Sequence, residues 1–161
     1  MEVSKILLDT SFLIRVLDPN DPDHANFRRY LEFFLRKSDI IYLSTIVAAE
    51  YGVMDSIHHL PLALSKIRIL PFNLDHATKA SEFGRASYDA RRKGVVQVGK
   101  RVIIPNDTKL LAQAEVERVN LFIGRDDNCQ AVHRFLKTSE LVNFEYQDAR
   151  IPFNEFTGEL F

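Results

Sequence analysis

The sequence predicts an α/β fold with a largely parallel central sheet. Short apolar runs of strand length alternate with helical patterns along the chain of 161 residues, and this alternation is typical of strand–helix–strand units. A chain of this length fits one domain, and an apolar content of 46% with 12 phenylalanines can fill a hydrophobic core. We therefore expect a single domain over residues 1–161, with residues 147–161 as a C-terminal tail.

The N-terminal half contains two predicted strand–helix units. Residues 3–8 form an apolar strand, and "DTSFLIRVLD" contains the start signal and apolar positions of a helix. Residues 24–37 carry apolar side chains at helical spacing, which predicts an amphipathic helix. The run "IIYLS" at 40–44 predicts a second strand. Its final serine, or the threonine after it, can cap the helix "IVAAEYGVMDSI" that follows.

The C-terminal half continues the alternation. The run "KIRILPFN" predicts a third strand, whose proline restricts it to an edge or terminal position. Residues 75–93 predict a long helix ended by Gly94, and the basic region up to Arg101 reads as a loop or short ribbon. Helices are then predicted at "NDTKLLAQAEVERV" and "DNCQAVHRFLK", and strands at "NLFIG" and "LVNFEY". The aromatic tail is expected to pack on the protein's own body.

Composition excludes several classes of protein. The N-terminus lacks the basic start and apolar segment of a signal peptide, and no apolar run approaches the ~18 to 20 residues of a membrane span. We expect a cytoplasmic protein without a membrane partner. Cys129 is the only cysteine, which excludes an internal disulfide and disfavours a thiolate zinc site. Its helical spacing with Val132 and Leu136 favours a core position over a pair with His133.

Charge is distributed unevenly along the chain. The net charge is −1, yet residues 85–101 contain six basic side chains against Asp89 alone. A local basic strip can attract a polyanion even on a mildly acidic protein. The alternative interpretation is a solvated surface without a partner.

Two aspartates follow predicted strands. Asp9 interrupts the apolar run "ILLDTSFLI", and Asp126 comes after "LFIGR". Binding sites of open parallel sheets form beyond the carboxyl ends of the strands, so both side chains would enter one crevice if their strands are neighbours. The alternative for each aspartate is a helix N-cap.

Two further carboxylates fall on apolar helix faces. Glu50 has apolar residues four before, three after and seven after it, which places it on the stripe facing the sheet. Asp107 has leucines three and four after it, although a helix cap just after Pro105 is the alternative.

Four inward carboxylates in one crevice require cations. Each like-charged pair at ~4 Å repels by about 4 kcal/mol at an effective dielectric constant of about 20. A hard divalent ion provides the compensating charge, and oxygen-only ligands favour Mg²⁺ or Mn²⁺ over zinc. A pair of such ions ~3.5 to 4 Å apart supports phosphodiester hydrolysis.

The motifs "LLDTSFLI", "STIVAAEY", "IPNDTKLLAQA" and "LFIGRDDN" resemble, in order, the four acidic motifs of the PIN-domain ribonuclease family. The resemblance runs from Lys5 to Tyr146 and is greatest to the toxin members, the virulence-associated protein C-like proteins of bacterial toxin–antitoxin pairs. It implies a three-layer α/β/α sandwich. It also implies a Mg²⁺ or Mn²⁺ site whose metal-binding and catalytic residues are Asp9, Glu50, Asp107 and Asp126.

The same resemblance implies an endoribonuclease that cleaves single-stranded or structured RNA. The mechanism it suggests is attack of a water molecule, activated by the metal, in line on a backbone phosphate, which leaves a 5′-phosphate and a 3′-hydroxyl. Homodimers and a small antitoxin protein that blocks the site are further implications.

Residues around the four carboxylates receive supporting roles. Thr10 or Ser11 could hydrogen-bond a ligand carboxylate or a water at the metal. Arg91, Arg92 and Lys93 are candidate contacts for RNA phosphates.

One position departs from the family pattern. The family usually has threonine or serine two residues before the fourth aspartate, where this chain has Gly124. Asp127 could share the role of Asp126. The alternative function is a catalytically weak or inactive PIN-like domain that binds RNA or a protein partner.

Overall fold

The structure, a computed structural model, describes residues 3–92 and 105–158, without the side chains of residues 91 and 92. Within these residues, five parallel strands form one sheet in the order β3-β2-β1-β4-β5. The strands are β1 (Lys5–Leu8), β2 (Ile40–Ser44), β3 (Ile67–Leu70), β4 (Leu121–Gly124) and β5 (Glu145–Asp148). The predicted α/β fold with a parallel sheet is confirmed, and β3 lies at an edge, as its proline indicated.

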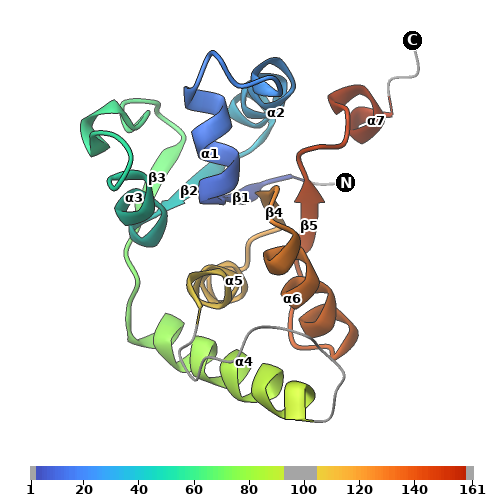
Figure 1. Ribbon diagram of the computed structural model, residues 1–161. Helices are drawn as coiled ribbons and strands as arrows, with labels where there is room; N and C mark the ends of the chain where they lie inside the picture. Colours follow the sequence, from blue (N-terminus) through green and yellow to red (C-terminus); the bar gives the residue numbers. More distant parts are fainter. Residues whose placement is uncertain (1–2, 93–104, 159–161) are drawn as a thin grey trace.

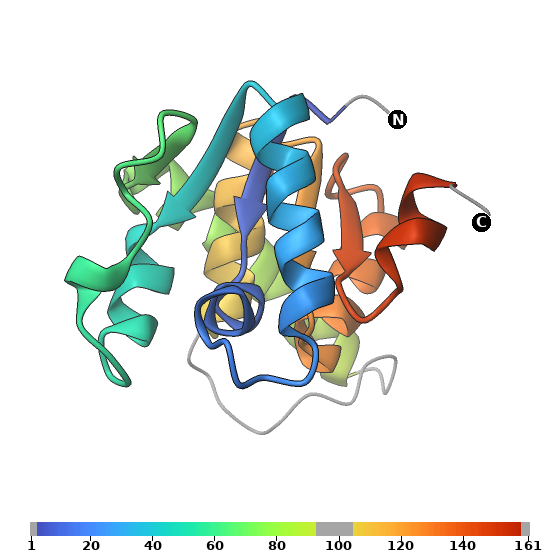
Figure 2. The same ribbon diagram turned by 90° about the horizontal axis from the view of Figure 1, so that it is seen from above.

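Helices cover both faces of the sheet (Figure 1). On one side lie α1 (Thr10–Leu17) and α2 (His24–Lys37), with α3 (Thr45–Tyr51) beside α1 and α7 (Phe153–Thr157) against α2. On the other side lie α5 (Asn106–Val116) and α6 (Asp127–Thr138), and α4 (Leu74–Arg92) packs on both of them. Figure 2 shows α2 running alongside the strands. The three-layer α/β/α sandwich is therefore confirmed.

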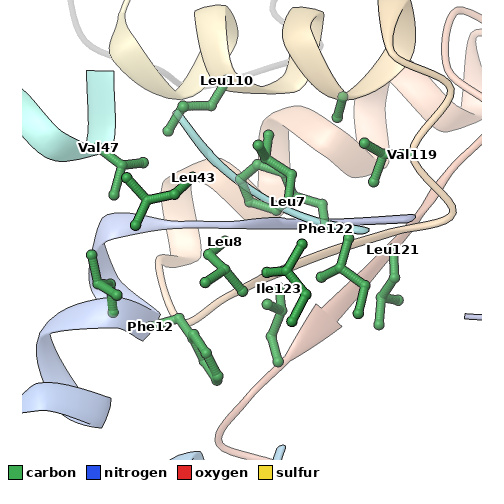
Figure 3. Close-up of a cluster of buried hydrophobic side chains, with 14 of the residues drawn as sticks. Leu7, Leu8, Phe12, Leu43, Val47, Leu110, Val119, Leu121, Phe122 and Ile123 are labelled. Atoms are coloured by element: carbon green, nitrogen blue, oxygen red, sulfur yellow. The ribbon is translucent and has the colours of Figure 1, made fainter. Parts of the chain in front are cut away.

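The hydrophobic core fills both spaces between the sheet and its helices. In Figure 3, Leu110 of α5 lies on one side of the sheet and Phe12 of α1 on the other. The ring of Phe12 stacks on that of Phe27 at 5.3 Å, and the apolar side chains of β1 and β4 are almost completely buried. Parallel sheets are stable when both faces are covered in this way, because their strands are apolar on both sides.

The helix carrying Glu50 is shorter than predicted. It ends at Tyr51 instead of Ile57, where Gly52 caps it, and a short 3₁₀ turn (Ile57–His59) follows. Val53 is 86% exposed, so the predicted apolar stripe does not continue toward the sheet. The cause is local. Glycine at position 52 weakens the helix, and the Asp55 carboxylate accepts hydrogen bonds from the Tyr51 hydroxyl and from the backbone amide of Ser56, which favours a turn.

The last strand lies further along the chain than predicted. It pairs with β4 over Glu145–Asp148, so the first two residues of the predicted tail belong to the sheet. Val142 and Phe144 are buried without strand pairing. Hydrogen bonds to β4, rather than the apolar run itself, decide where β5 begins and ends.

The C-terminal tail packs on α2. Phe153 and Phe156 form an aromatic cluster with three rings of that helix, Tyr30, Phe33 and Phe34. Through residue 158 the tail therefore covers the protein's own body, as expected from the sequence.

Two sequence predictions concern residues beyond this description. Lys93 and the predicted basic loop at 94–101 lie outside the described residues, as do the side chains of Arg91 and Arg92 at the end of α4. Within the described ranges, no helix is long and apolar enough to cross a membrane.

Candidate active site

Strand order brings Asp9 and Asp126 to the same edge of the sheet. β1 and β4 are neighbours, and the amide of Asp9 continues their ladder by donating to the carbonyl of Ile123 at 2.9 Å. Each aspartate also caps the helix that follows it, since Asp9 accepts from the amide of Ser11 and Asp126 from that of Cys129. Each aspartate can therefore cap a helix and also lie at the shared edge of the sheet, so the two interpretations are compatible.

Glu50 connects three elements at this edge. Its Oε2 accepts from the hydroxyl of Thr10 in α1, and its Oε1 accepts from the side-chain amide of Asn106 in α5 at 2.7 Å. The carboxylate thus faces the acidic edge, although Val53 and Ile57, which predicted its direction, are exposed and outside the helix. That part of the sequence reasoning was wrong, because the helix ends before either residue.

Asp107 lies in the first turn of α5 and accepts no hydrogen bond from a described residue. The residue at the cap position of this helix is Pro105, so Asp107 does not act as the N-cap. Burial raises the pKa of Asp107 to about 7, and the charges of Asp9, Asp126 and Glu50 add to that shift. The charges of the other three carboxylates therefore reach Asp107.

Asp9 is the most deeply buried of the four, with 4% of its surface exposed. Burial raises its pKa, hydrogen bonds from the amide and hydroxyl of Ser11 and from the amide of Thr10 oppose that rise, and Glu50 adds to it. The Cys129 thiol is completely buried near the same group, and its pKa is raised by burial and by all four carboxylates. Cys129 thus stays a neutral thiol in the core, as its spacing predicted.

The chemistry of the donor set, though not its spacing, fits a hard divalent cation. Among the described residues, no donor occupies Oδ2 of Asp126 or either oxygen of Asp107, and no basic side chain lowers the pKa of Asp9 or Asp107. Carboxylate oxygens with uncompensated charge suit Mg²⁺ or Mn²⁺. Within residues 3–92 and 105–158, however, no three Asp, Glu, His or Cys side chains are close enough to chelate one ion as they stand.

Asp127 points away from this group. Its carboxylate pairs with the guanidinium of Arg150 at 2.6 Å, its side chain is 78% exposed, and Arg150 also pairs with Asp148. The adjacent aspartates thus have different surroundings, since Asp126 caps α6 beside β4 while Asp127 faces the C-terminal segment.

Three residues near the carboxylates were missed by the sequence reasoning. Asn106 donates to Glu50, the amide of Arg125 donates to the hydroxyl of Ser11 at 2.9 Å, and the hydroxyl of Tyr146 lies beside Gly124. Asn106 and Arg125 each precede a candidate acidic residue, which was an available signal. Tyr146 had none, because it comes from a distant strand.

A buried hydrogen bond links α3 to α5. The hydroxyl of Ser44 donates to the side-chain oxygen of Gln113 at 2.5 Å and accepts from the amide of Ile46, the first turn of the helix that carries Glu50. We expect Ser44→Ala to lower the free energy of unfolding by about 1–3 kcal/mol, because one helix cap and one buried acceptor lose their partner. Urea denaturation measures this loss. The matched control is Ser56→Ala, at an exposed cap, and equal losses in both variants would contradict the expectation.

The parallel sheet, the helices on both faces and the acidic edge define an α/β/α sandwich protein with a carboxylate site. The sequence model of the PIN domain matches residues 6–134, which is most of the chain, and the chain belongs to this family. PIN-domain nucleases generally use divalent metal ions. A search among curated proteins found no match.

Solved structures with a similar fold include Fit and Vap proteins from several bacteria. FitAcB from Neisseria gonorrhoeae is 20% identical, with a TM-score of 0.61, over 91% of this chain and 99% of that one. VapBC2 from Rickettsia felis, bound to a DNA fragment from its promoter, is 19% identical, with a TM-score of 0.57, over 89% and 99%. VapC20 from Mycobacterium tuberculosis, a sarcin–ricin loop cleaving toxin, is 16% identical, with a TM-score of 0.56, over 78% and 93%. At these identities the similarity establishes the fold.

Proposed function

We propose that this protein is a metal-dependent endoribonuclease that hydrolyses phosphodiester bonds of single-stranded RNA. The observation that carries the proposal is the convergence of four carboxylates, from the ends of β1 and β4 and from α3 and α5, at one edge of the sheet. Membership of the PIN family supports it. In this proposal Asp9, Glu50, Asp107 and Asp126 hold Mg²⁺ or Mn²⁺.

Neighbouring side chains set the positions of these ligands. The hydroxyls of Thr10 and Ser11 bond to Glu50 and Asp9, and Asn106 fixes the second oxygen of Glu50. A divalent ion would supply a hydroxide near neutral pH and would stabilise the charge that develops on the phosphate. Holding Glu50 by two donors keeps its charge in place before RNA arrives, which reduces the reorganisation that catalysis requires.

The toxin role is part of the same proposal. VapC20 is described as a toxin that cleaves the sarcin–ricin loop, and VapBC2 as bound to DNA of its promoter. From the resemblance to the toxin members of the family, we propose that the protein acts in the cytoplasm as a homodimer and is inhibited by a small antitoxin. Co-expression with the neighbouring gene tests for that partner by co-purification.

The second candidate is a PIN domain that binds RNA or a protein partner without cleaving it. Gly124 favours this candidate, since a hydroxyl usual in the family is missing there. Incubation of the purified protein with single-stranded RNA, in Mn²⁺ or in EDTA, separates the two. Cleavage only with Mn²⁺ supports the nuclease, whereas RNA retention in EDTA with no cleavage in either condition supports the binding domain.

The basic strip leads to a prediction about salt. If Arg91, Arg92 and Lys93 contact phosphates, changing all three to glutamine should weaken RNA binding and flatten the slope of log K against log salt by about 2, because each single-strand phosphate contact contributes ~0.7. Filter binding between 50 and 300 mM KCl, in EDTA to prevent cleavage, measures that slope. The control changes Arg28, Arg36 and Lys37 of α2 to glutamine. An equal change of slope in both variants would show that the basic strip is a solvated surface without a specific RNA contact.

A further inference from the structure

Gly124 ends β4 at a point where no side chain has room. A Cβ atom on Gly124 would lie 2.8 Å from the hydroxyl oxygen of Tyr146 and 3.1 Å from both Cβ and Oδ2 of Asp9. The backbone there does not have the positive φ that favours glycine, which among the described glycines occurs only at Gly158. Space, rather than backbone conformation, therefore accounts for the glycine.

The hydroxyl that fills this space is firmly held. Tyr146 pairs with Phe122 across β5 and β4, and its ring stacks on the Phe122 ring at 5.5 Å and lies 5.7 Å from that of His133. The hydroxyl donates to the backbone carbonyl of Asp126 at 3.3 Å. Because two neighbouring rings hold the Tyr146 ring and a hydrogen bond orients its hydroxyl, the hydroxyl cannot easily yield to a side chain at position 124.

The hydroxyl lies among the proposed metal ligands. A Cβ atom at position 124 would lie 2.8 Å from the hydroxyl oxygen and 3.1 Å from Oδ2 of Asp9, so both oxygens border the same space. The hydroxyl donates to the backbone carbonyl of Asp126. Its single proton is used by the Asp126 carbonyl, which leaves its oxygen as an acceptor facing the site. A serine or threonine at 124 would have offered a hydroxyl to the same space.

We propose that Tyr146 is a positioning residue of the acidic site, which supplies from β5 the hydroxyl that this chain lacks at Gly124 and which holds the backbone of Asp126 at the space beside Asp9. This inference rests on the proposed function, because it gives these aspartates their role as metal ligands. It also accounts for the departure from the family pattern at Gly124, since a hydroxyl is present but comes from another strand.

Metal affinity tests the inference independently of cleavage. We expect Tyr146→Phe to weaken Mn²⁺ binding in isothermal titration calorimetry by about 10-fold, the lower end of the effect of groups that orient metal ligands. The ring and its stacking remain, so the fold should be retained, which unfolding in EDTA measures. The matched control is Tyr42→Phe on β2, a half-buried tyrosine near Glu117, which should leave Mn²⁺ affinity unchanged.

Rescue by serine distinguishes positioning from simple packing. In the wild-type background, Gly124→Ser should lower both stability and Mn²⁺ affinity, because its Cβ meets the tyrosine oxygen. In the Tyr146→Phe background the nearest oxygen is gone, and the Asp9 atoms at 3.1 Å need to move by only a few tenths of an ångström. The double variant should therefore bind Mn²⁺ more tightly than Tyr146→Phe alone.

Each outcome has one meaning. Weaker Mn²⁺ binding in Tyr146→Phe together with rescue in the double variant supports the inference. Unchanged Mn²⁺ binding in Tyr146→Phe, or additive losses in the double variant, overturns this inference alone and leaves the proposed function intact. Wild-type protein that neither binds Mn²⁺ nor cleaves RNA overturns the proposed function and this inference with it.

Discussion

Asp9→Asn is expected to reduce RNA cleavage by about 10³-fold, with a fold at least as stable as the wild type. The change removes one charge from the group that would hold the metal, and a loss of about 4 kcal/mol of electrostatic interaction corresponds to roughly that factor in rate. The amide oxygen can still accept from Ser11, and asparagine caps helices as well as aspartate does. Single-turnover cleavage in Mn²⁺ and urea denaturation measure the two effects.

The matched control for Asp9→Asn is Asp127→Asn. This change removes the same charge from the same edge of the sheet, but its carboxylate is exposed and pairs with Arg150. We expect its cleavage rate to stay close to that of the wild type, because surface ion pairs contribute little. Equal losses of activity in both variants would show that the general negative charge, or a shared role of Asp127, matters more than the buried carboxylate of Asp9.

Asp107→Asn is expected to stabilise the metal-free protein at pH 8. The pKa of Asp107 in the folded protein is about 7, above its ordinary value of 3.8, because of burial and three neighbouring carboxylates. The folded state therefore binds the proton more tightly than the unfolded chain does. The contribution of Asp107 to the free energy of unfolding is highest below about pH 4, falls as the pH rises toward 7 and is constant above pH 7.

Neutral asparagine removes this dependence on pH. The melting temperature of the variant should exceed that of the wild type by about 5 °C at pH 8, a modest value because a partly exposed carboxylate is screened by solvent. The difference should vanish near pH 4. Differential scanning fluorimetry in EDTA across this range measures it, and Asp75→Asn, at the exposed start of α4, is the control.

Divalent ions should reverse the order of stability. If Mn²⁺ binds only the folded protein through these carboxylates, it should raise the melting temperature of the wild type and should raise that of Asp107→Asn by less. Wild-type protein that is already more stable than Asp107→Asn at pH 8 in EDTA would contradict the electrostatic strain inferred for this site.

Much of the fold follows from short-range patterns. The helix over residues 24–37 and the strand over residues 40–44 have the predicted boundaries, because apolar spacing and flanking polar residues act within a few residues of each other. The predicted alternation of strands and helices is likewise confirmed. The predicted boundaries of the last strand were wrong, because the hydrogen bonds between β5 and β4 decide where β5 begins and ends.

The candidate site was predictable in part. The positions of Asp9 and Asp126 after strands indicated a shared edge, and the structure makes their strands neighbours. Glu50 faces this edge for a reason other than the predicted one, since Thr10 and Asn106 hold it there.

The sequence by itself determined the parallel α/β class, the main helices and the four acidic positions, because each depends on residues close together in the chain. Only the tertiary structure decided which groups surround those acids. Tyr146 reaches Gly124 through the pairing of β5 with β4, and Asn106 reaches Glu50 through the packing of α5 beside α3. Contacts between distant segments depend on strand order and helix packing, which no local pattern encodes.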